Sequence, residues 1–174
     1  MLNEYLEPIF NAVWPSAVRF RRSLMTQIDF YILPDTTLDA RLGFACRLAE
    51  TIHRKGFRLH LHAEDEAMAK LIDERLWTFK PESYLPHAVI GSEMAATVPV
   101  TIGWQGPPDP AREMDPDMAM LNLHPEIPEW FSRFSRVAEI INQHQDVLTA
   151  KRECWRIYKQ RGYPVTPHHL PAQD

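Results

Sequence analysis

The chain has 174 residues, a formal net charge of −4, 45% hydrophobic residues and 24% charged residues. That length suits one domain with a sizeable core, and the composition excludes a largely disordered chain, a collagen-like chain and a coiled-coil rod. The acidic balance argues against a general nucleic-acid binder, which usually carries a basic excess. The chain contains 6 glycines and 15 prolines. We therefore expect little material for glycine-rich phosphate loops and several rigid connections.

The first 24 residues precede the first predicted strand, and two interpretations of them stay open: a short amphipathic helix or an unstructured leader. Met25 begins a stretch that runs directly into that strand, so it is an alternative start and residues 1–24 are an N-terminal extension. Charged residues interrupt the apolar ones here, so we expect no signal peptide. No apolar run reaches the length of a membrane span. Cys46 and Cys154 form no CxxC pair, which favours a reducing, cytoplasmic setting.

Strands and helices alternate along the first half of the chain. An aromatic and β-branched run at residues 28–33 predicts a strand, and alternation predicts a second strand at 57–62. Between them, Thr36 or Thr37 offers an N-cap for a helix that stops at Gly56. A second helix begins at Asp65 and extends to residue 76. The short connections favour a parallel βαβ arrangement.

In the second half, residues 78–96 are predicted to be a long connection and residues 105–118 a proline-rich acidic loop. The remaining predicted elements are strands at 98–104 and 118–123, a helix from Pro128 to Ile141, and a last helix from Asp146 to Arg161. The sequence thus predicts a single α/β domain with a mostly parallel central sheet flanked by helices. We place this domain at residues 25–163, followed by a proline-rich tail at 164–174 that is extended or mobile.

The motifs of nucleotide-binding α/β proteins are missing. No Gly-x-Gly-x-x-Gly follows the first strand, and the chain has no Gly-Lys-Ser/Thr and no Gly-x-Ser-x-Gly. The turn after the first strand, Pro34-Asp35-Thr36-Thr37, has no glycine that would bring the backbone near a pyrophosphate. We therefore expect an α/β fold without a nucleotide-binding loop.

The histidines of the second strand leave an enzyme open as an alternative. His60 and His62 alternate on one strand and point to the same face, and Glu64 follows at the end where open α/β sheets place ligands. One interpretation is a metal-dependent or acid–base centre at these three residues. The other is two packed imidazoles, with acidic residues placed to favour the start of the next helix.

The last helix combines cations with large apolar side chains. On a helical wheel Ala150, Cys154 and Ile157 face the core, while a stripe on the opposite side contains Leu148, Arg152, Trp155 and Lys159, with Arg156 at its edge. Exposed apolar groups among cations suit a partner that is both acidic and hydrophobic. The alternatives are direct binding of single-stranded DNA and a solvated face whose tryptophan packs on a loop.

A second candidate surface lies at the end of the helix at 65–76 and in the loop after it. Its large apolar residues either cap the core or form a docking patch: Trp77, Phe79, Tyr84, Leu85 and Pro86.

Several segments together resemble the chi subunit of bacterial DNA polymerase III holoenzyme over roughly residues 25–163. They are Phe30-Tyr31-Ile32-Leu33, Glu64-Asp65-Glu66, Leu76-Trp77, Pro81-Glu82-Ser83-Tyr84-Leu85-Pro86-His87, Arg152-Glu153, Tyr158-Lys159 and Gly162-Tyr163. The resemblance implies a Rossmann-like domain without nucleotide binding. It also implies an accessory protein with no catalytic residues, cofactor or metal. This family couples the clamp-loader complex to single-stranded DNA-binding protein, whose acidic C-terminal tail ends in proline and phenylalanine.

The resemblance also implies two sets of site residues. The tail would be held by Arg152 and Trp155, with Arg156 and Ile141 as neighbours. A family lysine is replaced by Leu148, and Lys151 or Lys159 would substitute for it. The surface that docks the psi subunit or an alternative helicase partner would contain Trp77 and Tyr84, together with Pro86 and His87 of the same motif.

Overall fold

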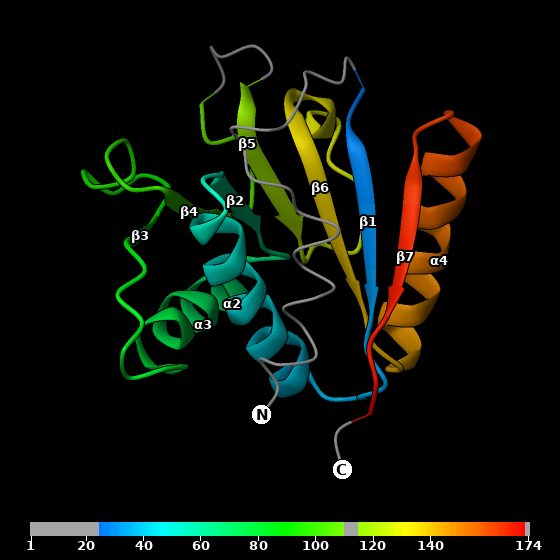
Figure 1. The fold of residues 1–174 in the computed structure, drawn as a ribbon, viewed down its shortest axis with the longest axis horizontal. Helices are drawn as coiled ribbons and strands as arrows, with labels where there is room; N and C mark the ends of the chain where they lie inside the picture. Colours follow the sequence, from blue (N-terminus) through cyan, green and yellow to red (C-terminus); the bar gives the residue numbers. More distant parts are fainter. Residues whose placement is uncertain (1–24, 110–114, 173–174) are drawn as a thin grey trace.

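Seven parallel strands form one open sheet in the computed structural model, which describes residues 25–109 and 115–172 (Figure 1). The strand order is β3-β4-β2-β5-β6-β1-β7. The predicted α/β class and parallel sheet are confirmed. Residues 1–24, the predicted N-terminal extension, lie outside the described residues.

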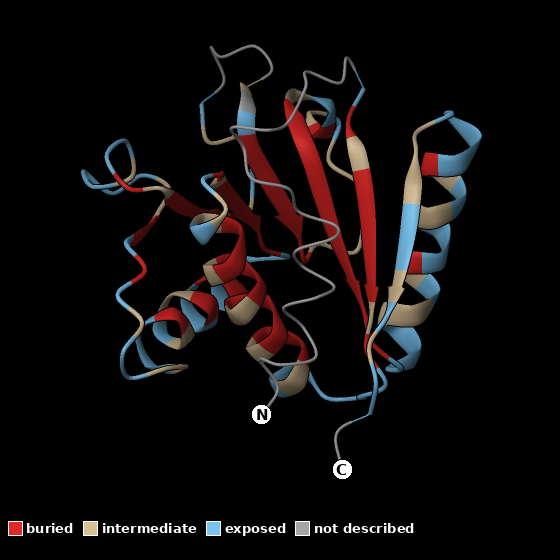
Figure 2. Ribbon diagram, viewed as in Figure 1, coloured by how far each residue is buried: buried red, intermediate tan, exposed pale blue. Residues whose placement is uncertain are grey.

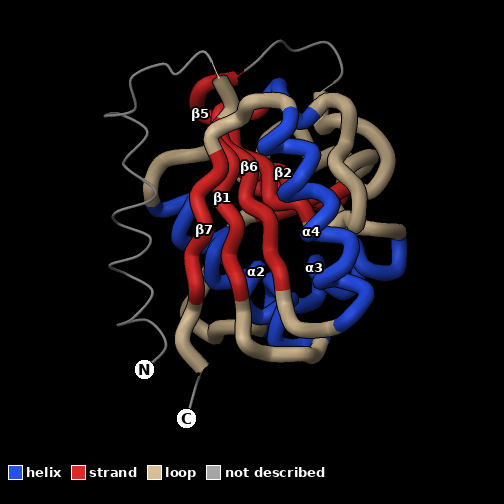
Figure 3. The backbone as a smooth tube through the Cα atoms, turned by 90° about the vertical axis from the view of Figure 1, so that its right-hand side faces the viewer, coloured by secondary structure: helices blue, strands red, loops and turns tan. Residues whose placement is uncertain are grey.

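The strands are β1 (Gln27–Ile32), β2 (Arg58–His62), β3 (His87–Val89), β4 (Val100–Gly103), β5 (Asp115–Asn122), β6 (Phe134–Ile141) and β7 (Val165–His169). The helices are α2 (Leu38–Arg54), α3 (Glu66–Thr78) and α4 (Gln145–Gln160), with a 3₁₀ turn η2 (Phe131–Arg133). Helices α2 and α3 lie on one side of the sheet, while α4 covers the other side near β1 and β7 (Figures 1 and 3). No described helix is both long and apolar enough to cross a membrane.

The helix boundaries follow from local chemistry. The Thr37 hydroxyl accepts a hydrogen bond from the Ala40 amide at 3.1 Å, so Thr37 rather than Thr36 caps α2. Asp65 caps α3 through the Met68 amide at 2.8 Å. After α2 and α4 the chain turns at Gly56 and Gly162, whose φ angles of 91° and 80° are accessible to glycine with little strain.

The sheet separates two hydrophobic cores. One packs α2 and α3 against one face, around residues such as Tyr31, Leu48 and Leu121. The other packs α4 and η2 against the opposite face, around Phe30 and Tyr158. The central strands are therefore buried on both sides (Figure 2), as is usual for parallel sheets.

The predicted helix from Pro128 to Ile141 is wrong, because residues 134–141 form the central strand β6. All eight residues of β6 are buried, including the polar Arg136 and Glu139, which pair with other buried groups. A strand covered on both faces has no alternation of apolar and polar residues, and a short apolar run then resembles a buried helix.

Two further strands occupy segments predicted to be connections. β3 forms within the long connection at 78–96, and β7 forms within the C-terminal tail. β7 pairs with β1 in parallel, so the sheet continues beyond the predicted domain end at residue 163. The flanking bonds from Ile28 N to Pro164 O and from Leu170 N to Ile32 O turn the Pro167 nitrogen away from β1. The missing amide of Pro167 therefore costs no bond in the ladder.

A buried acidic residue ties β7 to the sheet. Asp29 on β1 accepts a hydrogen bond from Arg136 at 2.7 Å and lies 3.0 Å from His168 Nε2. The His168 ring also stacks on Tyr31, with ring centroids 5.0 Å apart. The C-terminal strand is thus held by side chains as well as by its backbone.

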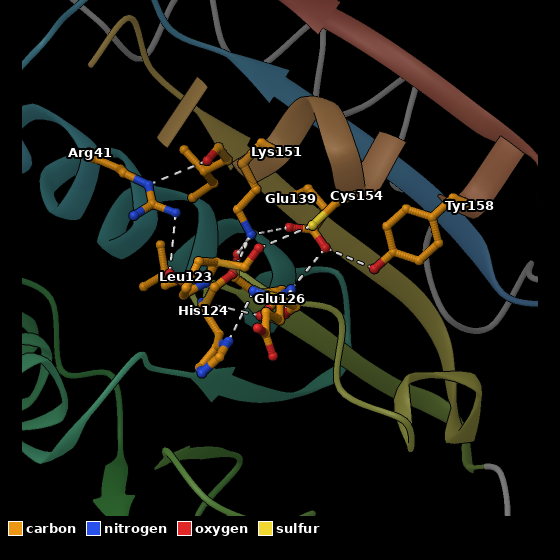
Figure 4. A network of polar contacts seen from close by, with 11 residues as sticks. Arg41, Leu123, His124, Glu126, Glu139, Lys151, Cys154 and Tyr158 are labelled. Atoms are coloured by element: carbon orange, nitrogen blue, oxygen red, sulfur yellow. Dashed lines mark hydrogen bonds and ion pairs between the residues drawn. The ribbon is translucent and has the colours of Figure 1, made fainter. Parts of the chain in front are cut away.

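Helix α4 is attached to the sheet by a buried ion pair (Figure 4). Lys151 Nζ lies 2.5 Å from Glu139 and also donates to the carbonyl oxygens of Asn122 and His124 at 3.2 and 2.6 Å. Tyr158 donates to the other Glu139 oxygen at 2.8 Å. Because Lys151 and Glu139 are both fully buried, each charge depends on the other.

We expect His168→Ala to lower the free energy of unfolding by about 1–2 kcal/mol, because it removes both the contact with Asp29 and the stacking on Tyr31. His169→Ala is the matched control, since His169 is exposed on the same strand. Urea denaturation of both variants checks this. Equal stabilities would show that the His168 contacts contribute nothing.

We expect Glu139→Gln to lower the free energy of unfolding by about 3–5 kcal/mol, because Lys151 would be left charged, buried and without its carboxylate. The control Glu126→Gln removes an exposed carboxylate and should change stability by less than about 0.5 kcal/mol. Adding Lys151→Met to Glu139→Gln should recover part of the loss, as measured by urea denaturation. A purely additive double variant would contradict this coupling.

Candidate functional site

The crevice that binds ligands in many open α/β sheets is bridged by the chain's own hydrogen bonds. β1 and β6 are neighbours, and the helices that follow them go to opposite faces, which is where such crevices form. The Gln143 backbone amide donates to Asp35 O at 2.7 Å, and its side chain donates to Leu33 O at 3.0 Å. Asn142 donates to Thr37 O at 3.2 Å. The two loops therefore bind each other at the place a nucleotide would occupy.

The three residues of the predicted metal-dependent or acid–base centre, His60, His62 and Glu64, do not share one environment. His60 and His62 are buried, whereas Glu64 is exposed. Burial lowers the pKa of His60 to about 3 and that of His62 to about 4, so both imidazoles are neutral at neutral pH. His60 Nδ1 lies 2.9 Å from the Thr101 hydroxyl. In the described part of the chain no group of three or more His, Cys, Asp or Glu could hold a metal.

Helix α4 is turned relative to the helical-wheel prediction. Its inner face carries Lys151, Cys154 and Tyr158. Leu148 and Trp155 are half-buried and pack against this core at the rim of the helix, so their predicted position opposite the core is wrong. The prediction assumed that lysine points to water, whereas Lys151 points inward to Glu139. Lys151 therefore cannot serve as the surface cation that would replace the family lysine.

Trp155 is held in place from below and flanked by cations. Its ring meets Phe30 edge to face, with centroids 5.0 Å apart, and Lys159 Nζ lies 5.6 Å from its centroid. Arg152 is exposed, and no ion pair joins it to any described residue. The helix thus presents a fixed aromatic ring beside an available guanidinium.

Strand β7 supplies a second side to this region. The register pairs Val165, Pro167 and His169 with β1 residues that face α4, so these three side chains share that face. Val165 packs with the Trp155 core, while Pro167 and His169 are exposed. The sequence prediction missed them because the tail was placed outside the domain. We call the set Leu148, Arg152, Trp155, Lys159, Pro167 and His169 the α4–β7 surface.

Two further predicted residues have different places. Ile141 is buried at the end of β6 in the same core as Leu148 and Trp155, so it supports the α4–β7 surface from below. Arg156 is exposed one turn after Arg152, but its guanidinium is paired with Glu153.

A second exposed aromatic surface lies around α3 and β3. Trp77 is 65% exposed and Tyr84 is 88% exposed, and Pro86 beside them is exposed as well. His87 is buried instead: its Nδ1 donates to Leu85 O at 2.7 Å and its ring lies 4.6 Å from that of Trp77. His87 therefore supports Trp77 from below. We call Trp77, Tyr84 and Pro86 the α3–β3 surface.

The two surfaces are far apart on the molecule. β3 and β7 are the two edge strands of the sheet. In Figure 1 α3 and β3 lie on the left, and α4 and β7 lie on the right. Both surfaces are therefore accessible at the same time.

A likeness to a solved structure concerns the fold alone. The crystal structure of T4 UvsW matches 83% of this chain and 41% of its own chain, with a TM-score of 0.59 and 10% identity.

The matches to three curated relatives span nearly the whole length of each relative, and each relative is named DNA polymerase III subunit chi. The protein of Pseudomonas aeruginosa is 40% identical over 147 residues, which is 84% of this chain and 99% of that protein. The proteins of Haemophilus influenzae and Escherichia coli are 28% and 27% identical, over 82% and 80% of this chain and 96% and 95% of their own.

The family model described as "DNA polymerase III chi subunit, HolC" matches residues 25–166. The match begins at the predicted start of the domain and ends inside β7. This chain therefore belongs to the family of DNA polymerase III chi subunits, whose members are accessory subunits in DNA replication.

Proposed function

We propose that this protein links the polymerase III clamp-loader complex to single-stranded DNA-binding protein by holding that protein's acidic C-terminal tail on the α4–β7 surface. The observation that carries the proposal is the exposed Arg152 beside the half-buried Trp155. A cation next to a fixed aromatic ring suits a peptide that ends in a carboxylate and a phenylalanine.

Electrostatics would bring the tail to this helix. Residues 151–163 contain five basic side chains and one acidic side chain, although the whole chain carries a net charge of −4. Burial of Lys151 leaves four basic side chains at the surface: Arg152, Arg156, Lys159 and Arg161. A tail with several aspartates is attracted to this local excess, and salt should weaken the attraction.

Burial of the terminal phenylalanine would supply most of the affinity. Its ring would pack on Trp155 and Pro167, above the apolar support of Leu148 and Ile141. Arg152 would pair with the terminal carboxylate through two parallel hydrogen bonds. Because Phe30 already holds Trp155, little side-chain ordering is needed when the tail binds.

The missing family lysine changes the second half of this recognition. Leu148 stands in its place and offers apolar contact instead of charge. Lys151 is buried, so Lys159, above the face of Trp155, is the remaining lysine of the surface. We expect a larger hydrophobic share of the binding energy than a lysine at this position would give.

The α3–β3 surface would dock the psi subunit or an alternative helicase partner. Trp77 and Tyr84 are aromatic anchors of the kind that dominate protein interfaces. Since the two surfaces lie at opposite edges of the sheet, one molecule can hold both partners and so connect the clamp loader to the tail. In this role the protein acts in the cytoplasm at the replisome, without a cofactor or activity of its own, and contacts DNA only indirectly.

We expect Arg152→Ala to weaken binding of the tail peptide at least tenfold, because the terminal carboxylate loses its partner. The wild-type dissociation constant should be micromolar, which corresponds to a binding free energy of about −8 kcal/mol. Arg161→Ala is the matched control, since it removes the same charge from the end of the same helix and should weaken binding less than threefold. Isothermal titration calorimetry checks this, and equal losses would refute the site.

The same titration distinguishes the rival functions. A peptide without its last residue should bind at least tenfold more weakly, because the aromatic anchor and the adjacent terminal carboxylate are lost or displaced. A single-stranded oligonucleotide alone should show no binding in the micromolar range. Micromolar affinity for the oligonucleotide would instead favour direct DNA binding through Trp155.

We expect the double variant Trp77→Ala/Tyr84→Ala to lose binding to the purified psi subunit or helicase partner, with unchanged affinity for the tail peptide. Leu71→Ala is the control, because Leu71 is another exposed apolar residue of α3. Surface plasmon resonance with both ligands tests the separation. Loss of tail binding in the double variant would show that the two surfaces are not independent.

A further inference from the structure

Two arginines one turn apart on α4 differ in their surroundings. The Arg152 guanidinium makes no hydrogen bond to another described residue, whereas all three guanidinium nitrogens of Arg156 are engaged. Arg156 Nε and Nη2 donate to the two Glu153 oxygens at 3.0 and 2.5 Å. Nη1 donates to Gln160 Oε1 at 3.0 Å.

The Glu153 carboxylate occupies the fork of Arg156 in the bidentate manner that an acidic ligand would use. Both side chains are exposed, so the pair is open to exchange with a ligand in solution. The hydrogen bond from Arg156 lowers the pKa of Glu153, because it stabilises the ionised carboxylate. Glu153 is thus chemically equivalent to an aspartate of a bound tail.

We infer that Glu153 is an internal competitor for Arg156, so that an acidic ligand gains Arg156 only by displacing it. This inference rests on the proposed function and adds that Glu153 regulates the affinity of the same site for acidic ligands. Arg152 is available at once and would take the terminal carboxylate. A carboxylate further upstream in the peptide would reach Arg156 only against Glu153.

The arrangement would make affinity depend on how many carboxylates the ligand carries. A peptide with a single carboxylate would be satisfied by Arg152 and leave the Glu153–Arg156 pair intact. A peptide with further aspartates raises the local carboxylate concentration at Arg156 and competes with Glu153. Glu153 would thereby lower the affinity for moderately acidic chains.

The first test measures binding of the acidic tail peptide to Glu153→Gln by isothermal titration calorimetry. Affinity should rise about three- to tenfold, and the gain should fall below twofold when the upstream aspartates of the peptide are replaced by asparagine. In the Arg156→Ala background the same substitution should also gain less than twofold. A gain that persists without Arg156 would overturn the inference.

Asp146→Asn is the matched control for the change in charge. Asp146 is exposed on α4 two turns before Glu153 and does not contact Arg156. Its removal should improve affinity less than twofold. Equal gains for Asp146→Asn and Glu153→Gln would mean that only net charge matters, which would also overturn the inference.

The second test needs no ligand of the proposed function. Phenylglyoxal modifies accessible guanidinium groups, and peptide mass spectrometry measures the rate at each arginine. In the wild type Arg156 should react at least threefold more slowly than Arg152, and in Glu153→Gln the two rates should become similar. If the wild type does not bind the tail, the proposed function fails, yet these rates still decide whether Glu153 shields Arg156. Equal rates in the wild type would refute the shielding.

Discussion

The position of α4 depends on one buried ion pair. Glu139, in the middle of the central strand β6, and Lys151, on the inner face of the helix, are fully buried and 2.5 Å apart. The carbonyl oxygens of Asn122, at the end of β5, and of His124 accept hydrogen bonds from Lys151, while the Tyr158 hydroxyl and the Asn122 side chain donate to Glu139. Removing either charge would leave the other buried without a partner, so the pair favours the rotation of α4 that places Lys151 against Glu139. That rotation puts Trp155 at the rim, where its ring contacts Phe30 and stays only half-buried.

The same constraint explains which part of the site could be predicted from sequence. Arg152, Trp155 and Lys159 were grouped correctly, because their angular spacing on a helix is independent of how the helix is turned. Trp155 was predicted wrongly to lie opposite the core, whereas Arg152 and Lys159 are exposed as predicted. A helical wheel places charged residues outside and contains no information on a partner such as Glu139 in another element, which turns Lys151 inward. His87 was misplaced for a similar reason: its burial depends on hydrogen bonds to backbone groups.

The fold was predictable where the pattern is local. The first two strands and helices carry turn residues and caps at their ends, and they form where expected. β6 was not predictable, because a strand buried on both faces shows no alternation. β7 was not predictable either, because its pairing with β1 depends on Asp29 and His168, which are 139 positions apart in the chain. A residue pair so distant leaves no periodic signal in either segment.

The proline in β7 has a consequence for how the protein avoids association with itself. An edge strand exposes unpaired amides and carbonyls that can recruit a strand from another molecule. The Pro167 nitrogen points away from β1, to the side of β7 on which no other described strand pairs, and it has no hydrogen to donate. A foreign strand laid alongside would therefore meet a gap in the ladder. The edge next to the α4–β7 surface is thereby protected against sheet-to-sheet aggregation. A peptide held there would be recognised by side chains and not by strand pairing. Pro167 would contribute an apolar contact to the peptide and would also prevent the sheet from gaining another strand.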